Sequence, residues 1–196
     1  MLAADKINLE KVSILVVDDN ANSLGIMTSV LAGFGARSVQ TCNTADEAKA
    51  ILNKDRIDLM LTDGEMPNET GYDLVSWLRR EGKEPNRYCS VIVVTGHTRH
   101  ARVLHARDCG AHFVVSKPLT PDILLQRIFW VANSERLFID ADGYKGPDRR
   151  FKQEGPPAGM DGRRADDLPI EVGEASEPNL TQEELDAIMK VGKVAL

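Results

Sequence analysis

The stretch "SILVVDDNANS", residues 13–23, joins an apolar run to two adjacent aspartates. Ile14–Val17, preceded by Ser13, has the short, β-branched character of a strand that is buried on both faces. Asp18 and Asp19 follow it directly. Unpaired carboxylates at the edge of a core are costly, because burial and like charge both disfavour their ionised forms. This placement indicates that the two acids have a task at the end of the strand.

The composition is that of a protein with one substantial core. The chain has 196 residues, of which 42% are hydrophobic, and no apolar run reaches the roughly 20 residues of a membrane span. Its start, "MLAADKINLEK", lacks the apolar centre of a signal peptide. Three cysteines without metal-ligand spacing are expected to be reduced thiols: Cys42, Cys89 and Cys109. These features predict a cytoplasmic protein with no membrane partner.

Acidic charge is concentrated in the last part of the chain. Residues 140–196 contain 13 Asp and Glu against 8 Lys and Arg, and so carry −5 of the formal net charge of −6. Binding to nucleic acid phosphates requires the opposite sign of charge. The composition therefore argues against nucleic acid as a partner.

The first 139 residues alternate between two periodicities. Runs rich in valine and isoleucine predict five strands, at Ile14–Val17, Ser38–Cys42, Leu59–Thr62, Val91–Val94 and Phe113–Val115. Helical patterns follow them at about residues 22–33, 44–54, 70–80, 98–108 and 121–133, and Thr44 with Glu47 forms a predicted capping box. This alternation predicts an α/β fold, with a doubly wound, five-stranded parallel sheet that is covered by helices on both faces.

The composition changes after Ile139. Residues 140–178 hold 11 glycines and prolines in 39 positions and few apolar side chains, which predicts a flexible arm without a core of its own. Residues 179–192 regain a helical pattern, with Thr181 as a candidate N-cap. We therefore expect an N-terminal lead at 1–10, one domain at 11–139, the arm at 140–178 and a short amphipathic helix at 179–192.

Polar side chains stand at the ends of four predicted strands. They are Asp18 and Asp19 after the first, Asp63 after the third, Thr95 at the end of the fourth and Lys117 at the end of the fifth. The carboxyl ends of parallel strands share one edge of the sheet, where ligands bind in doubly wound folds. A hard divalent cation, Mg²⁺, would remove the repulsion among the three carboxylates and prefers oxygen ligands.

Each of these residues also has an explanation without chemistry. The aspartate pair could cap the helix that begins near Ala21, Asp63 could be a turn residue, and Thr95 could cap a helix. Lys117 could be an ordinary surface lysine. These explanations do not account for five such residues at one sheet edge.

Residues 11–134 resemble the response-regulator receiver domain. The motifs that carry the resemblance occur in order at predicted strand ends: Asp18-Asp19, Asp63 followed by Met66-Pro67 and Gly71, Thr95-Gly96, and Lys117-Pro118. The resemblance implies a flavodoxin-like receiver fold and a phosphoryl group accepted by Asp63 from a histidine kinase. A receiver catalyses only its own phosphorylation and dephosphorylation, so no other enzymatic activity is expected.

The resemblance also implies roles for the other pocket residues. Asp19, Asp63 and the backbone carbonyl of Glu65 would bind Mg²⁺, with Asp18 nearby, directly or through water. Thr95 and Lys117 would hold the phosphoryl oxygens, and the Lys117-Pro118 bond is usually cis in this family. A carboxylate nucleophile with charge neutralisation and positioned donors is also what acyl phosphate formation requires on chemical grounds.

The sequence departs from the family pattern three residues before the lysine. Many members have an aromatic residue there that turns inward on phosphorylation, whereas this chain has Val114. Its aromatic residue is Phe113, which on a strand points to the opposite face. Glu65 and His97 occupy the two positions that flank the water path to the aspartyl phosphate in the family, and they leave the phosphate lifetime open.

No pattern of a DNA-binding or catalytic output domain follows the domain, so we expect a stand-alone regulator that signals by phosphorylation-dependent protein binding, as chemotaxis-type regulators do. The segment "LTQEELDAIM" resembles the N-terminal peptide of the flagellar motor switch protein, which binds such regulators. The expected effector is therefore the flagellar motor switch or another receiver. The segment's predicted contact residues are Leu180, Leu185, Ile188 and Met189.

Three alternatives remain open at this point. A phosphorelay intermediate or phosphate sink would also be a bare receiver. An aspartyl-phosphate phosphohydrolase of the haloacid-dehalogenase type should show Asp-x-Asp after its first strand, where this chain has Asp-Asp-Asn at 18–20. The last segment is otherwise a helical tail without a partner.

Overall fold

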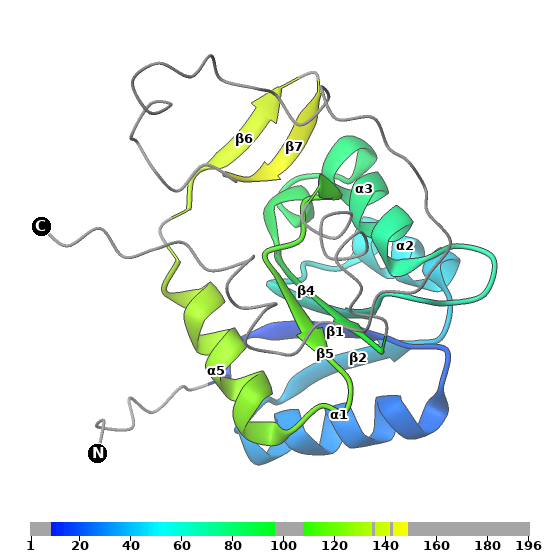
Figure 1. The fold of residues 1–196 in the computed structure, drawn as a ribbon, viewed down its shortest axis with the longest axis vertical. Coiled ribbons are helices and arrows are strands. Elements are labelled where there is room, and N and C mark those ends of the chain that lie inside the picture. The colour runs from blue at the N-terminus through cyan, green and yellow to red at the C-terminus, as the bar shows by residue number, and fades with distance from the viewer. Residues whose placement is uncertain (1–8, 97–107, 135, 142, 149–196) are drawn as a thin grey trace, which may run out of the picture.

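The computed structural model describes residues 9–96, 108–134, 136–141 and 143–148. Five strands form a parallel sheet in the order β2-β1-β3-β4-β5 (Figure 1). They are β1 (Ser13–Val17), β2 (Ser38–Cys42), β3 (Leu59–Asp63), β4 (Ser90–Thr95) and β5 (Phe113–Ser116). The predicted doubly wound parallel sheet is confirmed, and each strand begins and ends close to its predicted residues.

Helices cover both faces of this sheet. They are α1 (Ala21–Gly33), α2 (Ala45–Lys54), α3 (Gly71–Glu81), the 3₁₀ turn η1 (Asn86–Tyr88) and α5 (Pro121–Ala132). Figure 1 shows α1 and α5 on one side of the sheet, and α2 and α3 on the other. The predicted helix at 98–108 lies outside the described residues except at its end. Among the helices described, none combines the length and apolar character that crossing a membrane requires.

Side-chain caps fix where the helices begin. Thr44 accepts a hydrogen bond from the Glu47 amide at 3.2 Å, as predicted for the start of α2. The Asn20 side chain accepts from the amides of Asn22 at 2.9 Å and Ser23 at 3.3 Å, and thereby caps α1. The explanation of Asp18 and Asp19 as helix caps is therefore wrong, because Asn20 performs this role.

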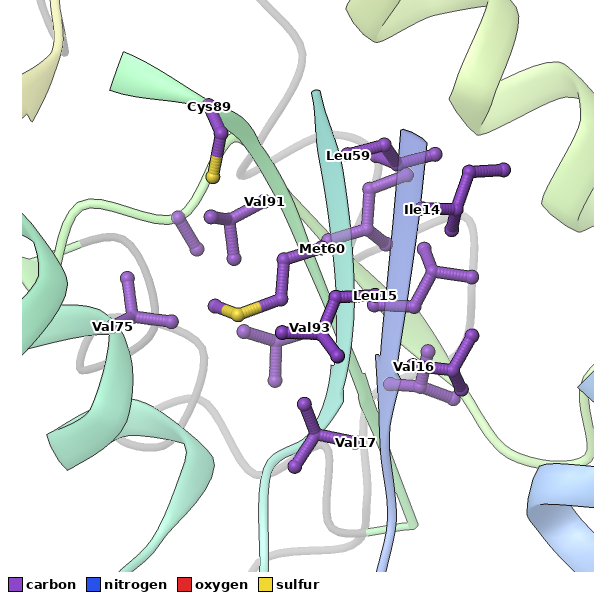
Figure 2. Packing of buried hydrophobic residues seen from close by; sticks show 14 of the residues in the cluster. Ile14, Leu15, Val16, Val17, Leu59, Met60, Val75, Cys89, Val91 and Val93 are labelled. Atoms are coloured by element: carbon purple, nitrogen blue, oxygen red, sulfur yellow. The ribbon is translucent and has the colours of Figure 1, made fainter. Parts of the chain in front are cut away.

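The core lies on both faces of the central strands, since Ile14, Leu15, Val16 and Val17 are all fully buried. Figure 2 shows Ile14 and Val16 directed to one side of the sheet, and Met60 and Val91 directed to the other, toward Val75 of α3. Burial of every residue is the pattern of a parallel strand that is covered twice. The predicted thiols Cys42, Cys89 and Cys109 belong to this core as free cysteines.

The chain continues beyond α5 into a hairpin of β6 (Phe138–Ala141) and β7 (Tyr144–Pro147), which pair antiparallel. Figure 1 shows the hairpin beside α3. The Phe138 ring meets the Tyr88 ring edge-on, with centroids 4.7 Å apart, and Arg87 lies 4.0 Å from Asp140.

The hairpin corrects the predicted start of the flexible arm, because the boundary at residue 139 falls within β6. The glycines and prolines of its segment were counted as a sign of disorder, but Gly146 and Pro147 belong to β7 and are buried. The aromatic contact of Phe138 supplies burial that composition does not reveal. The remainder of the predicted arm and the segment at 179–192 lie outside the described residues.

Arg79 links the hairpin side of α3 to the sheet. Its side chain is 1% exposed, and its guanidinium donates to the carbonyls of Gly110 and Cys89, each at 3.0 Å, and to that of Arg87. Burial lowers the pKa of Arg79. The Phe138 ring covers the guanidinium, with 5.5 Å from Cζ to the ring centroid. A charge at this depth is tolerated because backbone oxygens replace its hydration.

Candidate functional site

Residues from four strand ends meet at the carboxyl edge of the sheet. Asp18 follows β1, and the last residues of β3 and β4 are Asp63 and Thr95. Lys117 follows β5, and its Nζ lies 2.9 Å from Asp18 Oδ2 and 2.7 Å from Asp63 Oδ2. Asp18 lies 99 positions and Asp63 54 positions before Lys117 in the sequence. The structure thus brings the predicted lysine onto two of the predicted acids.

Each of the two buried carboxylates has a fixed orientation. Asp18 is fully buried and Asp63 is 8% exposed. Their Oδ2 atoms bind Lys117, while their Oδ1 atoms accept from backbone amides, Asp18 from Asn20 at 2.9 Å and Asp63 from Glu65 at 3.0 Å. Both carboxylates are therefore held in fixed orientations, each between the lysine ammonium and a backbone amide.

Lys117 is held as a cation in the same cluster. Its partial burial would lower its pKa, but the hydrogen bonds and charges of Asp63 and Asp18 outweigh burial and raise the pKa above its ordinary value of 10.5. The Lys117 amide also donates to the Thr95 carbonyl at 2.8 Å. The peptide bond from Lys117 to Pro118 is cis, as the family resemblance implied.

The acidic cluster has the donor set of a divalent cation site. Asp18, Asp19 and Asp63 each provide a carboxylate oxygen, and these oxygens lie within 4.8 Å of one another. Asp19 is exposed, so the cluster is open to solvent on its side. One lysine does not balance three carboxylates, and oxygen-rich, partly hydrated sites of this kind suit Mg²⁺. The residues fit the predicted ion, and the Glu65 carbonyl as a further ligand stays a prediction.

Thr95 is 1% exposed and stands at the end of β4, with Ser116 as its partner on β5. Of the two residues that follow it, Gly96 is the last residue of the described segment, and His97 lies outside the described residues. Thr95 is thus placed at the carboxyl edge, although its predicted phosphoryl contact stays a prediction.

Phe113 and Val114 are directed as the strand pattern predicted. The Phe113 ring meets Trp130 of α5 at 5.1 Å between centroids, and the Arg127 guanidinium lies over it at 4.8 Å. Val114 is fully buried and lies opposite Val93 of β4. The aromatic residue of β5 therefore faces α5 and is part of the core.

His112 is half-buried and precedes β5, at the opposite end of that strand from Lys117. Its Nδ1 accepts from the Val91 amide at 3.0 Å and lies 3.5 Å from Arg79. Burial, with the nearby charges of Arg79 and Arg136, lowers its pKa well below 6.5. His112 is therefore held neutral and takes no part in the acidic site.

Sequence reasoning missed three contributors to the site. The amides of Asn20 and Glu65 orient the acids, and the Tyr72 side chain lies beneath the loop that follows Asp63. The asparagine after the aspartate doublet was a usable signal for the start of α1, because Asn is a strong N-cap residue. Nothing in the sequence distinguished Tyr72 from an ordinary buried helix residue.

This combination of a doubly wound sheet and an acid-lysine cluster at its carboxyl edge defines an α/β module built to handle a phosphoryl group or similar anion with a cation. The comparisons with known proteins name it more closely. The family model of the response regulator receiver domain matches residues 14–129. The chain belongs to the response regulator receiver family, whose members are phosphorylated on an aspartate.

Individual relatives are distant but span the domain. The chemotaxis protein CheY of Pseudomonas aeruginosa is 27% identical over 130 residues, covering 66% of this chain and 98% of that protein. The sensor histidine kinase RcsC of Escherichia coli is 30% identical over 128 residues, which are 65% of this chain and 13% of the kinase. The structure of chemotaxis protein CheY4 of Vibrio cholerae has a TM-score of 0.57 at 26% identity, covering 61% of this chain and 98% of that one.

Proposed function

We propose that this protein is a response regulator that accepts a phosphoryl group on Asp63 from the phosphohistidine of a histidine kinase. The observation that carries the proposal is Lys117, whose ammonium binds Asp63 and Asp18 together at the carboxyl edge of the sheet. In the reaction a carboxylate oxygen of Asp63 attacks phosphorus. The new O–P bond forms as the N–P bond breaks, and the leaving imidazole nitrogen keeps the bonding electrons and takes a proton.

The residues around Asp63 stabilise the charge that gathers on the transferred group. Lys117 is already within 2.7 Å of Asp63 and can pass from its Oδ2 to a phosphoryl oxygen, while Asp18 keeps the lysine in place. The Thr95 hydroxyl is the proposed second donor. Asp18, Asp19, Asp63 and the Glu65 carbonyl would hold Mg²⁺, which supplies neutralisation of the phosphoryl oxygens when bound.

The direct test is labelling by a small phosphodonor such as acetyl phosphate in Mg²⁺. The wild-type protein should gain one phosphoryl group by intact mass, and Asp63→Asn should gain none while keeping its circular dichroism spectrum. Asp46→Asn is the matched control, because Asp46 is exposed on α2 and outside the acidic cluster. Stoichiometric labelling of Asp63→Asn would show that another residue accepts the phosphoryl group.

We place the output in phosphorylation-dependent protein binding, within chemotaxis or motility, and assign no further enzymatic activity. The support is the set of relatives named as chemotaxis proteins, which the receiver matches over nearly their full length. The likeness to part of a sensor histidine kinase favours a second candidate, a phosphorelay intermediate. Onward transfer of the label to a histidine phosphotransfer protein, without binding to a motor switch protein, would select the relay.

We further propose that the segment at 179–192 binds a receiver, this one or another. Its sequence combines a capping box at Thr181 and Glu184 with apolar residues at Leu185, Ile188 and Met189. A peptide of residues 178–194 should shift NMR signals of α5 in the beryllofluoride-loaded protein. A peptide with Leu185→Ala and Ile188→Ala is the control, and equal shifts from both peptides would leave the segment without this role.

A further inference from the structure

The loop that follows Asp63 rests on an aromatic side chain of α3. A Cβ built at Gly64 would lie 2.6 Å from the Tyr72 hydroxyl oxygen, 2.9 Å from Tyr72 Cζ and 3.1 Å from Thr95 Cβ. The Gly64 backbone therefore fills the space between the phenol of Tyr72 and the side chain of Thr95. Tyr72 is fully buried, and the Gly64 amide is fixed to β4 by a bond to the Val94 carbonyl at 2.9 Å.

A second close approach brings α3 against the end of β3. A Cβ at Gly71 would lie 1.9 Å from the Asp63 carbonyl oxygen, and the Gly71 amide donates to the Gly64 carbonyl at 3.1 Å. Tyr72 is the next residue, in the first turn of α3. The start of this helix is therefore in backbone contact with the proposed phosphoacceptor, and the phenol is in contact with the residue after it.

The β5 residue that often carries the switch in related domains is aliphatic in this chain. Val114 has no ring, and the ring of Phe113 packs against Trp130 and Arg127 of α5. Within the part of the chain that the structure describes, the aromatic side chain packed against the Gly64–Thr95 contact is that of Tyr72.

We propose that Tyr72 is the positioning residue that couples the state of Asp63 to α3. The inference rests on the proposed phosphorylation of Asp63. When Thr95 moves toward a phosphoryl oxygen, the contact that it shares with Gly64 and Tyr72 must change, because a close-packed interior has no slack to absorb the movement. Tyr72 belongs to the first turn of α3, so a displaced ring moves the helix start. The signal then leaves the site through α3.

The experiment uses the full-length protein with beryllofluoride and Mg²⁺, which mimic the phosphorylated state. In the wild type, amide NMR signals should shift both in the pocket, at Gly64 and Thr95, and along α3. In Tyr72→Phe the pocket shifts should persist, while the α3 shifts are reduced several-fold. Tyr88→Phe is the matched control, because Tyr88 is 43% exposed at the other end of the sheet and should leave both sets unchanged.

A second measurement needs no variant. The ring signals of Tyr72 in the wild type should shift when beryllofluoride is added, because the ring contacts the loop that follows Asp63. Unshifted ring signals, or an α3 response in Tyr72→Phe equal to that of the wild type, would overturn the coupling role. Failure of the wild type to bind beryllofluoride or to be labelled would instead overturn the proposed phosphorylation itself.

Discussion

At the carboxyl end of the sheet two buried aspartates share one lysine, whereas at the amino end one buried arginine is surrounded by backbone carbonyls. Asp18, Asp19 and Asp63 carry three negative charges against the single charge of Lys117, so the group is left with a surplus of acid. The donors of Arg79 are instead matched by the carbonyls of Gly110, Cys89 and Arg87. The first arrangement is suited to take up a cation and an anion, and the second is suited to hold elements together.

The largest effect on stability is expected from replacing Arg79 at the amino end of the sheet. Arg79→Met should lower the free energy of unfolding by about 3 kcal/mol, because two buried carbonyls and a partly buried one lose a charged donor. Denaturant unfolding measures this, with Arg80→Met, in the exposed neighbouring position, as a control that changes little. The fraction of Arg79→Met that stays folded should still be labelled on Asp63. Loss of labelling at full stability would show that the two ends are not separable.

The hairpin is the next largest contribution to the amino end. A chain ending at residue 137 loses β6 and β7 and the edge-on contact of Phe138 with Tyr88, which should reduce stability by roughly 1–3 kcal/mol. A chain ending at residue 148 keeps the hairpin and is the matched control. Equal melting temperatures for the two truncations would show that the hairpin adds no stability and belongs with the predicted flexible arm.

His112 makes the stability of the amino end depend on pH. An unfolded histidine takes up a proton near pH 6.5, whereas the folded pKa of His112 lies well below that value. The unfolded chain then binds more protons, so this contribution is complete above pH 6.5 and falls as the pH drops, by up to about 1.4 kcal/mol per pH unit. Denaturant titrations from pH 7 to 5 should show a shallower slope for His112→Asn, and an unchanged slope would contradict the neutral His112.

The smallest effect on stability is expected at the acids. Asp19→Ala removes a ligand and also relieves like-charge repulsion, so Mg²⁺ affinity should fall by about tenfold or more, while the metal-free protein becomes slightly more stable. Calorimetric titration and thermal unfolding in a chelator measure the two quantities. Unchanged Mg²⁺ affinity in this variant would show that Asp19 is not a ligand of the ion. A lower melting temperature without metal would contradict the proposed repulsion among the three carboxylates.

The sequence was informative at one end of the sheet and misleading at the other. The carboxyl edge could be predicted because its chemistry needs particular residues, such as Asp18, Asp63 and Lys117, at the ends of strands whose periodicity is plain. The hairpin at 138–147 was missed because its turn residues resemble those of a flexible chain. It is held by contacts that are distant in sequence, such as that of Phe138 with Tyr88, which lies 50 positions earlier.

The roles of Arg79 and Tyr72 could not be predicted for a related reason. Arg79 stands in the last turn of α3, where a basic residue normally interacts with the helix dipole at the surface, and its burial depends on the loops before β4 and β5. Tyr72 occupies an apolar position of the helix, and only the approach of Gly64 in three dimensions places its hydroxyl beside the acid site.

The central claim, that Asp63 is the phosphoacceptor, is tested most directly by trapping the acyl phosphate in place. The protein is labelled in Mg²⁺, the aspartyl phosphate is reduced with borohydride to homoserine, and the peptides are sequenced by mass spectrometry. The account predicts homoserine at position 63 and at neither Asp18 nor Asp19. Homoserine at either of those two residues, or none at position 63 in a labelled protein, would contradict it.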